Sequence, residues 1–222
     1  MLSIVIPIFN AAESLAATLA SLQSLDMETE ILVVDGGSTD EGPEIARSLG
    51  AAVITAELGR GRQLRAGAAN AAGEWLLFLH ADTRLTGPWE SEAAQFMNME
   101  GDDRAAVFRL GLDDEAPQAR RLEQLVGWRT RRLGLPYGDQ GLLISRKFYE
   151  ELGGFRPMIM FEDVDMVRRI GRRRLKMLGA RAVTSAVRYR REGYAARAFR
   201  NNFCLALYFL GVPPAVIERL YR

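Results

Sequence analysis

Short apolar runs alternate with helical segments through the first 80 residues, and this rhythm restricts the possible folds more than any other feature. The runs lack the strict polar alternation of a half-buried strand, so each predicts a strand buried on both faces of a parallel sheet. The predicted strands span residues 2–6, 31–34, 51–55 and 75–79. A strand, helix, strand order of this kind predicts an α/β fold.

The segments between these strands carry helix signals. Asn10 and Glu13 match a variant of the capping box, so a helix is expected to begin near Asn10. A second helix is expected over residues 43–50, and an Ala-rich third helix after a loop at residues 59–62, closed by Gly73. The first helix presents a leucine stripe at helical spacing, made of Leu15, Leu19, Leu22 and Leu25.

Size, charge and cysteine usage narrow the classes of function. A chain of 222 residues fits one domain, and its net charge of +1 argues against a nucleic-acid partner. Cys204 is the single cysteine and lies in an apolar stretch, which predicts a buried small side chain. The apolar run at the N-terminus breaks at Pro7 and lacks the basic start of a signal peptide, so a cytoplasmic protein is expected.

Two of the predicted parallel strands lead into an aspartate. Asp35 follows the second strand directly, and Asp82 comes shortly after the fourth. Open α/β sheets bind ligands at the carboxyl ends of their strands, so both aspartates are candidates for a binding site there. Asp35 also fits a purely local role, in which its side chain accepts hydrogen bonds from the backbone of a turn.

After Thr83 the alternation of predicted strands and helices becomes less regular, but residues of the types that bind ligands occur again. A turn is expected at residues 138–141 (GDQG), and residues 161–165 (FEDVD) open a predicted helix. The apolar run at residues 203–212 is too short to span a bilayer. Further expected elements are a helix at 89–97, a strand at 105–110 and a basic helix from 117 to about 132.

Read in order, several segments resemble the family-2 glycosyltransferases. These are residues 4–10 (IVIPIFN), 33–40 (VVDGGSTD), 77–82 (LFLHAD) and 162–163 (ED). Other segments resemble the radical-SAM/selenodomain-associated subgroup of that family, namely residues 135–141 (LPYGDQG), 153–155 (GGF), 210–212 (LGV) and 220–222 (LYR). The resemblance covers nearly the whole chain.

This resemblance implies a GT-A fold, a Rossmann-like mixed sheet flanked by helices, in a single domain over residues 1–222. Residues 1–100 would bind the nucleotide sugar, and residues 101–222 would bind the acceptor and form a helical tail. The implied reaction is an inverting transfer of a hexose-like sugar from a nucleoside diphosphate to an acceptor hydroxyl. A divalent cation, Mn²⁺ or Mg²⁺, would neutralise the departing diphosphate.

The resemblance also suggests roles for single residues. Asp163 matches the general base, Glu162 would orient the acceptor, and Asp82 would hold the metal. Relatives carry Asp-X-Asp at the metal site, whereas this chain begins the motif with His80, which could be a metal ligand or hydrogen-bonded packing. Asp165 is expected to be structural.

Binding residues follow in the same way. The nucleotide-sugar set is Pro7, Phe9, Asn10, Glu13, Asp35, Arg60 and Arg62. Glu13 is equally well explained as a capping partner, and Arg60 and Arg62 could be solvated arginines of a glycine-containing loop. The acceptor set is Asp139 and Gln140, and Arg188 with Tyr189 resembles a variant of a pair near the diphosphate.

Other functions remain open. A non-catalytic nucleotide-sugar-binding or regulatory protein fits the missing first acid of the metal motif, but the intact Glu162 and Asp163 pair argues against it. A sugar nucleotidyltransferase and a dinucleotide dehydrogenase both need a glycine-rich loop after the first strand, which this chain lacks. The run at residues 203–212, with its arginine rim, predicts burial, a homodimer contact or a peripheral membrane contact.

Overall fold

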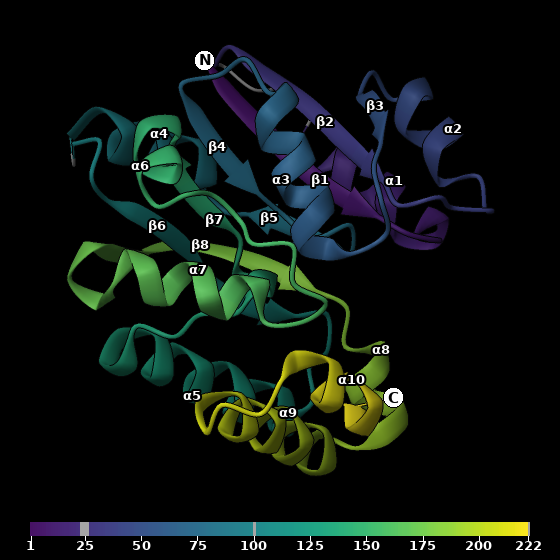
Figure 1. Ribbon diagram of the computed structural model, residues 1–222, viewed down its shortest axis with the longest axis vertical. Helices are drawn as coiled ribbons and strands as arrows, with labels where there is room; N and C mark the ends of the chain where they lie inside the picture. Colours follow the sequence, from purple (N-terminus) through teal and green to yellow (C-terminus); the bar gives the residue numbers. More distant parts are fainter. Residues whose placement is uncertain (23–26, 100, 222) are drawn as a thin grey trace.

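The computed structural model describes residues 1–22, 27–99 and 101–221 (Figure 1). Leu25 of the expected leucine stripe and the terminal Arg222 lie outside these residues. Over the described range, no helix is both long and apolar enough to cross a membrane.

One mixed sheet of eight strands organises the described chain, in the order β3-β2-β1-β4-β7-β6-β8-β5. The strands β1 to β4 run parallel, as predicted, and β7 is antiparallel to both of its neighbours. β8 is parallel to β6 and antiparallel to β5. The strands are β1 Leu2–Ile8, β2 Thr29–Asp35, β3 Ala52–Thr55, β4 Trp75–Phe78, β5 Thr83–Thr86, β6 Ala105–Leu112, β7 Leu142–Ser145 and β8 Leu175–Thr184.

Helices cover both faces of this sheet (Figure 1). They are α1 Ala12–Ala20, α2 Gly42–Ser48, α3 Arg60–Asn70, α4 Trp89–Met99, α5 Pro117–Leu133, α6 Arg146–Glu151, α7 Glu162–Ile170, α8 Val187–Glu192, α9 Tyr194–Phe209 and α10 Pro214–Tyr221, with two 3₁₀ turns, η1 Gly138–Gln140 and η2 Arg172–Arg174. Ile4 and Ile6 of β1 pack into the core that includes α1 and α4, whereas Val5 packs into the core that includes α3, α6 and α7. Burial on both faces of β1 is thereby confirmed.

The strand ends meet at one edge of the sheet. Ile8 pairs with Asp35, so β1 and β2 end together. β4 ends earlier, where Phe78 pairs with Val5, and the chain then continues along β1 because the Leu79 N–H donates to the Val5 carbonyl at 3.1 Å. Residues 80–82 therefore arrive beside the end of β1, as expected for a ligand site at the carboxyl edge.

The predicted capping box at Asn10 and Glu13 is wrong. Helix α1 begins at Ala12, and the Ala12 N–H donates to Oδ2 of Asp40 at 2.8 Å. Asn10 has a φ of 50° and its Oδ1 accepts from the Thr39 N–H at 2.9 Å, while Glu13 is exposed. The helix start is therefore bonded from a loop 28 residues away, which a local pattern does not reveal.

The expected loop at residues 59–62 is also wrong, because α3 begins at Arg60. Gly61 lies in the first turn, where an added Cβ would come within 2.3 Å of the Arg156 carbonyl oxygen. Gly73 does not cap the helix, which ends at Asn70. Its N–H donates to Ser3 Oγ at 2.8 Å, so close packing on β1 explains this glycine.

Sequence patterns also missed β5 and β8. β8 is only partly buried along its length and carries Gly179 in its middle, so its apolar pattern is weak. It forms a strand because β6 and β5 pair with its two edges. The tail run at residues 203–212 divides: Cys204 is buried, as predicted, while Phe203, Phe209 and Leu210 are exposed.

Two helical glycines give a paired prediction for stability. A Cβ at Gly67 of α3 would lie 2.3 Å from Val5 Cγ1, whereas one at Gly127 of α5 meets nothing closer than 3.7 Å. Gly67→Ala is expected to lower the free energy of unfolding by about 1–3 kcal/mol through overpacking. Gly127→Ala is expected to raise it by about 0.5–1 kcal/mol, because alanine favours the helix interior. Urea unfolding of both variants tests the pair, and a neutral Gly67→Ala would contradict the packing of α3 on β1.

Candidate functional site

A cavity of about 680 Å³ lies at the carboxyl edge of β1 and β4. Its lining comes from the end of β1, the start of α3, residues 80–82, η1, the start of α7 and the segments α8 to α10. This volume falls within the range of ligand pockets in proteins, about 300–1,000 Å³. The predicted catalytic and metal residues all line it: Asp163, Glu162, Asp82 and His80.

Asp82 is exposed to the cavity, and its carboxylate is held by hydroxyl groups. Oδ1 accepts from Thr184 Oγ1 at 3.3 Å and, at the limit of a hydrogen bond, from Thr83 Oγ1 at 3.5 Å. Both threonines are buried. β5 and β8, the strands that the sequence did not predict, therefore position the predicted metal ligand.

His80 packs beside Asp82 and against η1. A Cβ added to Gly138 would lie 2.6 Å from its Nε2. Burial and the guanidinium groups of Arg60 and Arg188 lower the pKa of His80 well below its ordinary value. The imidazole is therefore neutral at neutral pH, which is the form that binds metals.

Glu162 and Asp163 open helix α7 and make different contacts. Oδ2 of Asp163 accepts from the Gly138 N–H at 2.7 Å. Glu162 is buried and forms an ion pair with Arg60, whose NH1 lies 3.2 Å from Oε1. Burial raises the pKa of Glu162, Arg60 opposes this, and Asp163 adds to it.

Arg60 stands among three carboxylates. Desolvation opposes its ionisation, but Glu162, Asp163 and Asp82 raise its pKa above the ordinary value. Arg62 behaves differently, since it is exposed, pairs with Glu57 at 3.5 Å and does not line the cavity. Of the two predicted arginines, the structure thus brings only Arg60 into the site.

Some of the predicted nucleotide-binding residues line the cavity, and others do not. Pro7, Phe9 and Asn10 line the cavity, and Phe9 is 49% exposed. Glu13 does not line it. Asp35 is buried beside it, with Oδ1 accepting from the Ser38 N–H at 2.9 Å, which is the local turn role that the sequence allowed.

The two predicted acceptor residues also separate. Gln140 is fully buried and outside the cavity lining, because its Nε2 donates to the Phe108 carbonyl and its Oε1 accepts from Thr130. Asp139 lines the cavity, and burial raises its pKa to about 6, an effect that Arg129 opposes. Within the described part of the chain, Asp139 Oδ1 is buried without a hydrogen-bond partner.

A wall of C-terminal residues closes the cavity. Arg188 and Tyr189 of α8 line it, and Tyr189 stacks on Tyr194 of α9 with ring centroids 5.3 Å apart. Arg197 and Asn201 of α9 also line it, although no sequence pattern marked them.

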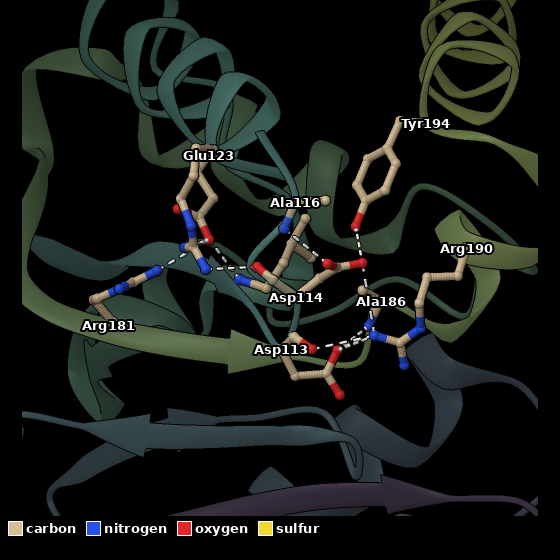
Figure 2. Close-up of polar contacts among 10 residues, drawn as sticks. Asp113, Asp114, Ala116, Glu123, Arg181, Ala186, Arg190 and Tyr194 are labelled. Atoms are coloured by element: carbon tan, nitrogen blue, oxygen red, sulfur yellow. Dashed lines mark hydrogen bonds and ion pairs between the residues drawn. The ribbon is translucent and has the colours of Figure 1, made fainter. Parts of the chain in front are cut away.

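Polar contacts shown in Figure 2 attach this wall to the sheet. The Ala186 N–H donates to Asp113, Arg190 pairs with Asp113 and Asp114, and the Tyr194 hydroxyl donates to Asp114 at 2.7 Å. Burial and the bond to Asp114 raise the pKa of Tyr194 to about 12. The tyrosine therefore stays a hydrogen-bond donor at any physiological pH.

Gln63 is a positioning residue that sequence reasoning missed. Its side chain is buried, and Nε2 donates to the carbonyls of Ile8 at 2.7 Å and Val34 at 2.9 Å. It therefore holds the ends of β1 and β2 together on the floor of the cavity. Its place three residues after Arg60, at the start of a helix that packs on β1, was the available signal.

The side chains that could bind a metal suit a cation whose remaining ligands come from a bound substrate. Among the described residues, no group of three or more His, Cys, Asp or Glu side chains could hold a metal ion. Asp82 offers carboxylate oxygen, the hard ligand that Mg²⁺ and Mn²⁺ prefer, and His80 offers a neutral nitrogen. Such a site fits a metal that also binds diphosphate oxygens.

The mixed sheet, with its cavity at the carboxyl edge of the parallel strands, defines a GT-A type α/β fold. Residues 3–161 match the model of glycosyl transferase family 2. The match spans more than half of the chain, and the chain belongs to this family. Membership of the radical-SAM/selenodomain-associated subgroup stays a prediction.

A curated relative and two solved structures illustrate the likeness. A PGL/p-HBAD biosynthesis glycosyltransferase of Mycobacterium bovis is 40% identical in an alignment over 93 residues, and the alignment covers 38% of this chain and only 36% of the relative. A mannosyltransferase of Pyrobaculum calidifontis in complex with GDP-Man and Mn²⁺ superposes with a TM-score of 0.64 at 18% identity, over 91% of this chain and 60% of that one. Glucosyl-3-phosphoglycerate synthase of Mycobacterium tuberculosis, bound to Mn²⁺, UDP and glucosyl-3-phosphoglycerate, gives 0.60 at 19% identity over 83% and 70%. At these identities the two structures show the fold alone.

The raised pKa of Asp139 predicts a pH-dependent stability. Its pKa is about 6 in the folded chain, against 3.8 for the unperturbed group, so the folded state holds this proton more tightly. Stability from this group is present below pH 4 and is lost as pH rises through 6. Asp139→Asn is therefore expected to be more stable than the parent at pH 8 by roughly 1–3 kcal/mol, and to lose this advantage near pH 4.

Urea unfolding at the two pH values measures the difference. Asp103→Asn, which alters an exposed carboxylate, is the matched control. An equal difference between Asp139→Asn and the parent at both pH values would contradict the raised pKa.

Proposed function

We propose that this chain is an inverting glycosyltransferase that moves a sugar from a nucleoside-diphosphate sugar to an acceptor hydroxyl, with the help of a divalent cation. One observation carries the proposal: Asp82, Asp163, Glu162, Arg60 and Arg188 converge on a single cavity of ligand size. Family membership and the Mn²⁺ and nucleotide complexes of the structural neighbours support it.

The donor would lie with its diphosphate near Asp82. When bound there, Mn²⁺ or Mg²⁺ supplies positive charge that stabilises the departing diphosphate. Arg188 is exposed, lines the cavity and acts electrostatically on His80, so it would add a guanidinium group suited to phosphate oxygens. With Asp82 as the single firm protein ligand, the affinity for the metal would depend on the nucleotide.

The nucleoside would lie over the end of β1. Phe9 offers an exposed ring at the cavity wall, and Asn10 stands beside it. Asp35 would read the base or the ribose from the end of β2, which requires its second carboxylate oxygen, because Oδ1 already accepts from Ser38. Because Asp35 lies beside the residues that line the cavity, the nucleoside would have to extend past the lining to contact it.

Asp163 would be the general base. The acceptor oxygen forms a bond to the anomeric carbon while the bond from that carbon to the diphosphate oxygen breaks, which inverts the configuration. Asp163 takes the proton from the acceptor hydroxyl, and the Gly138 N–H holds its carboxylate in place. Asp139 lies in the adjoining turn and lines the cavity, where its carboxyl group would bind acceptor hydroxyls.

Glu162 would act through Arg60 rather than on the substrate proton. The ion pair at 3.2 Å holds the guanidinium group among the carboxylates of the site. Without Glu162, Arg60 would be free to leave this position. This arrangement separates the roles of two neighbouring acids.

A non-catalytic nucleotide-sugar-binding protein is the second candidate. The neutral His80 in place of a first carboxylate favours it, because the metal site then has one firm protein ligand. The two functions differ in one measurement: a binding protein retains the nucleotide without transferring or hydrolysing the sugar.

Metal dependence gives the first test. Mn²⁺ is expected to increase the affinity for UDP or GDP. In Asp82→Asn this increase should be at least tenfold smaller than in the parent, because the carboxylate ligand is lost. Calorimetry with and without Mn²⁺ measures this increase. Glu13→Gln, outside the cavity, should leave it unchanged, and His80→Ala should reduce it less than Asp82→Asn. An unchanged metal response in Asp82→Asn would remove Asp82 as the ligand.

The base gives the second test. Asp163→Asn keeps the shape of the side chain but cannot take a proton, so transfer is expected to fall by about 10²-fold or more while donor binding persists. Single-turnover transfer, with donor affinity measured separately, checks both quantities. If Asp163→Asn keeps the parental rate and Glu162→Gln is inactive, the base is Glu162. Full activity in both variants would show that the site lies elsewhere.

A further inference from the structure

Helices α5 and α9 pack against each other, and α5 packs on β6 of the sheet. Together with α10 they form the part of the molecule that lies away from α1 and α2 (Figure 1). Several large side chains of both helices are exposed. We define the α5–α9 outer surface by Arg121, Leu125, Trp128, Arg132, Phe199 and Phe203.

Large apolar side chains are prominent on this surface. Leu125 and Trp128 of α5 are each 52% exposed, and Phe199 of α9 is 73% exposed. Arg121, Leu125, Trp128 and Arg132 recur at spacings of four, three and four residues, so they form one stripe along α5. Phe199 and Phe203 stack one turn apart on α9, with ring centroids 6.3 Å apart.

Arginine dominates the charge of these two helices. α9 contains no carboxylate, and the one in α5, Glu123, bonds to Arg120, Arg181 and the Leu112 N–H. Across the part of the chain that the structure describes, Arg121 and Arg132 form no ion pair. The surface therefore carries uncompensated positive charge although the whole chain has a net charge of only +1.

We propose that the α5–α9 outer surface binds the surface of an anionic lipid bilayer. Arginine beside exposed tryptophan and phenylalanine is the composition of helices that lie in the bilayer interface, where the rings enter the headgroup region and the cations meet anionic lipids. A second copy of this chain fits less well, because a two-fold contact would place arginine stripes together. The inference does not depend on the proposed transfer reaction.

Co-sedimentation with vesicles tests the charge requirement. The full chain is expected to bind vesicles of phosphatidylcholine with about 30% phosphatidylglycerol at least tenfold more tightly than pure phosphatidylcholine. Arg121→Glu/Arg132→Glu should lose this preference. Arg47→Glu/Arg84→Glu makes the same change of charge on exposed positions of α2 and β5 and should keep it. Equal loss in both double variants, or equal binding to the two kinds of vesicle, overturns the proposal.

A second pair of variants tests the apolar requirement. Phe199 and Met99 are both 73% exposed, so neither substitution opens the core. Phe199→Ser is expected to weaken binding to the anionic vesicles about tenfold, whereas Met99→Ser on α4 should not. Unchanged vesicle binding by Phe199→Ser would show that the apolar side chains of this surface do not enter the bilayer, and overturns the proposal. Sedimentation equilibrium showing a dimer that Phe199→Ser dissociates, with no vesicle binding, overturns it in favour of a second copy.

Tryptophan fluorescence supplies a direct readout. Trp75 and Trp89 are buried, so Trp128 is the exposed reporter. Brominated anionic lipids are expected to quench the tryptophan fluorescence of the parent, but not that of Trp128→Phe. Sedimentation with the vesicles without quenching of Trp128 would show that this surface is not the one that enters the interface, and overturns the proposal.

Discussion

The parallel pairing of β1 with β2 and β4 is the constraint on which the site depends. β1 is buried on both faces and lies between two strands of the same direction, so the ends of β1 and β2 reach one edge together with the segment that continues from β4. The Gln63 amide adds a bond to each of two strand ends at that edge. The floor of the cavity is consequently built from hydrogen-bonded strand ends, while its walls come from turns and helices.

Much of this floor was predictable, because strand burial and strand-end aspartates are local signals. Asp82 and the Glu162 and Asp163 pair lie in the cavity as expected, and Asp139 joins them. Apart from these residues of α7 and η1, which the family resemblance marked, the walls were not predictable. Asp40 bonds the start of α1 across 28 residues, and Arg197 and Asn201 look like ordinary residues of an amphipathic helix until the fold shows which side faces the cavity. Gln140 and Arg62 failed to reach the cavity for the same reason: a motif gives the position of a residue along the chain, whereas the direction of its side chain follows from the packing of distant elements.

The charge balance of the site gives a physical reason for a histidine at position 80, where the resemblance to relatives leads one to expect an aspartate. A single cation, Arg60, already faces Asp82, Glu162 and Asp163, and burial raises the pKa of Glu162 even beside this cation. A carboxylate at position 80 would add a fourth acid to a partly desolvated cluster, and like charges disfavour each other's ionisation there. A neutral imidazole avoids this cost and keeps the electrostatic potential of the cavity more favourable to a diphosphate.

Phe161 links the two sides of the cavity. This residue precedes the Glu162 and Asp163 pair with a φ of 64°, a left-handed conformation that costs a non-glycine residue about 1–2 kcal/mol. Its ring stacks on Tyr208 of α9 with centroids 4.8 Å apart, which helps to offset that cost. A glycine at this position would remove the strain but also the contact with the C-terminal wall. The C-terminal wall and the start of α7 therefore share this contact, so a substitution in α9 that removes the ring of Tyr208 would also weaken the support of the residue that precedes Glu162 and Asp163.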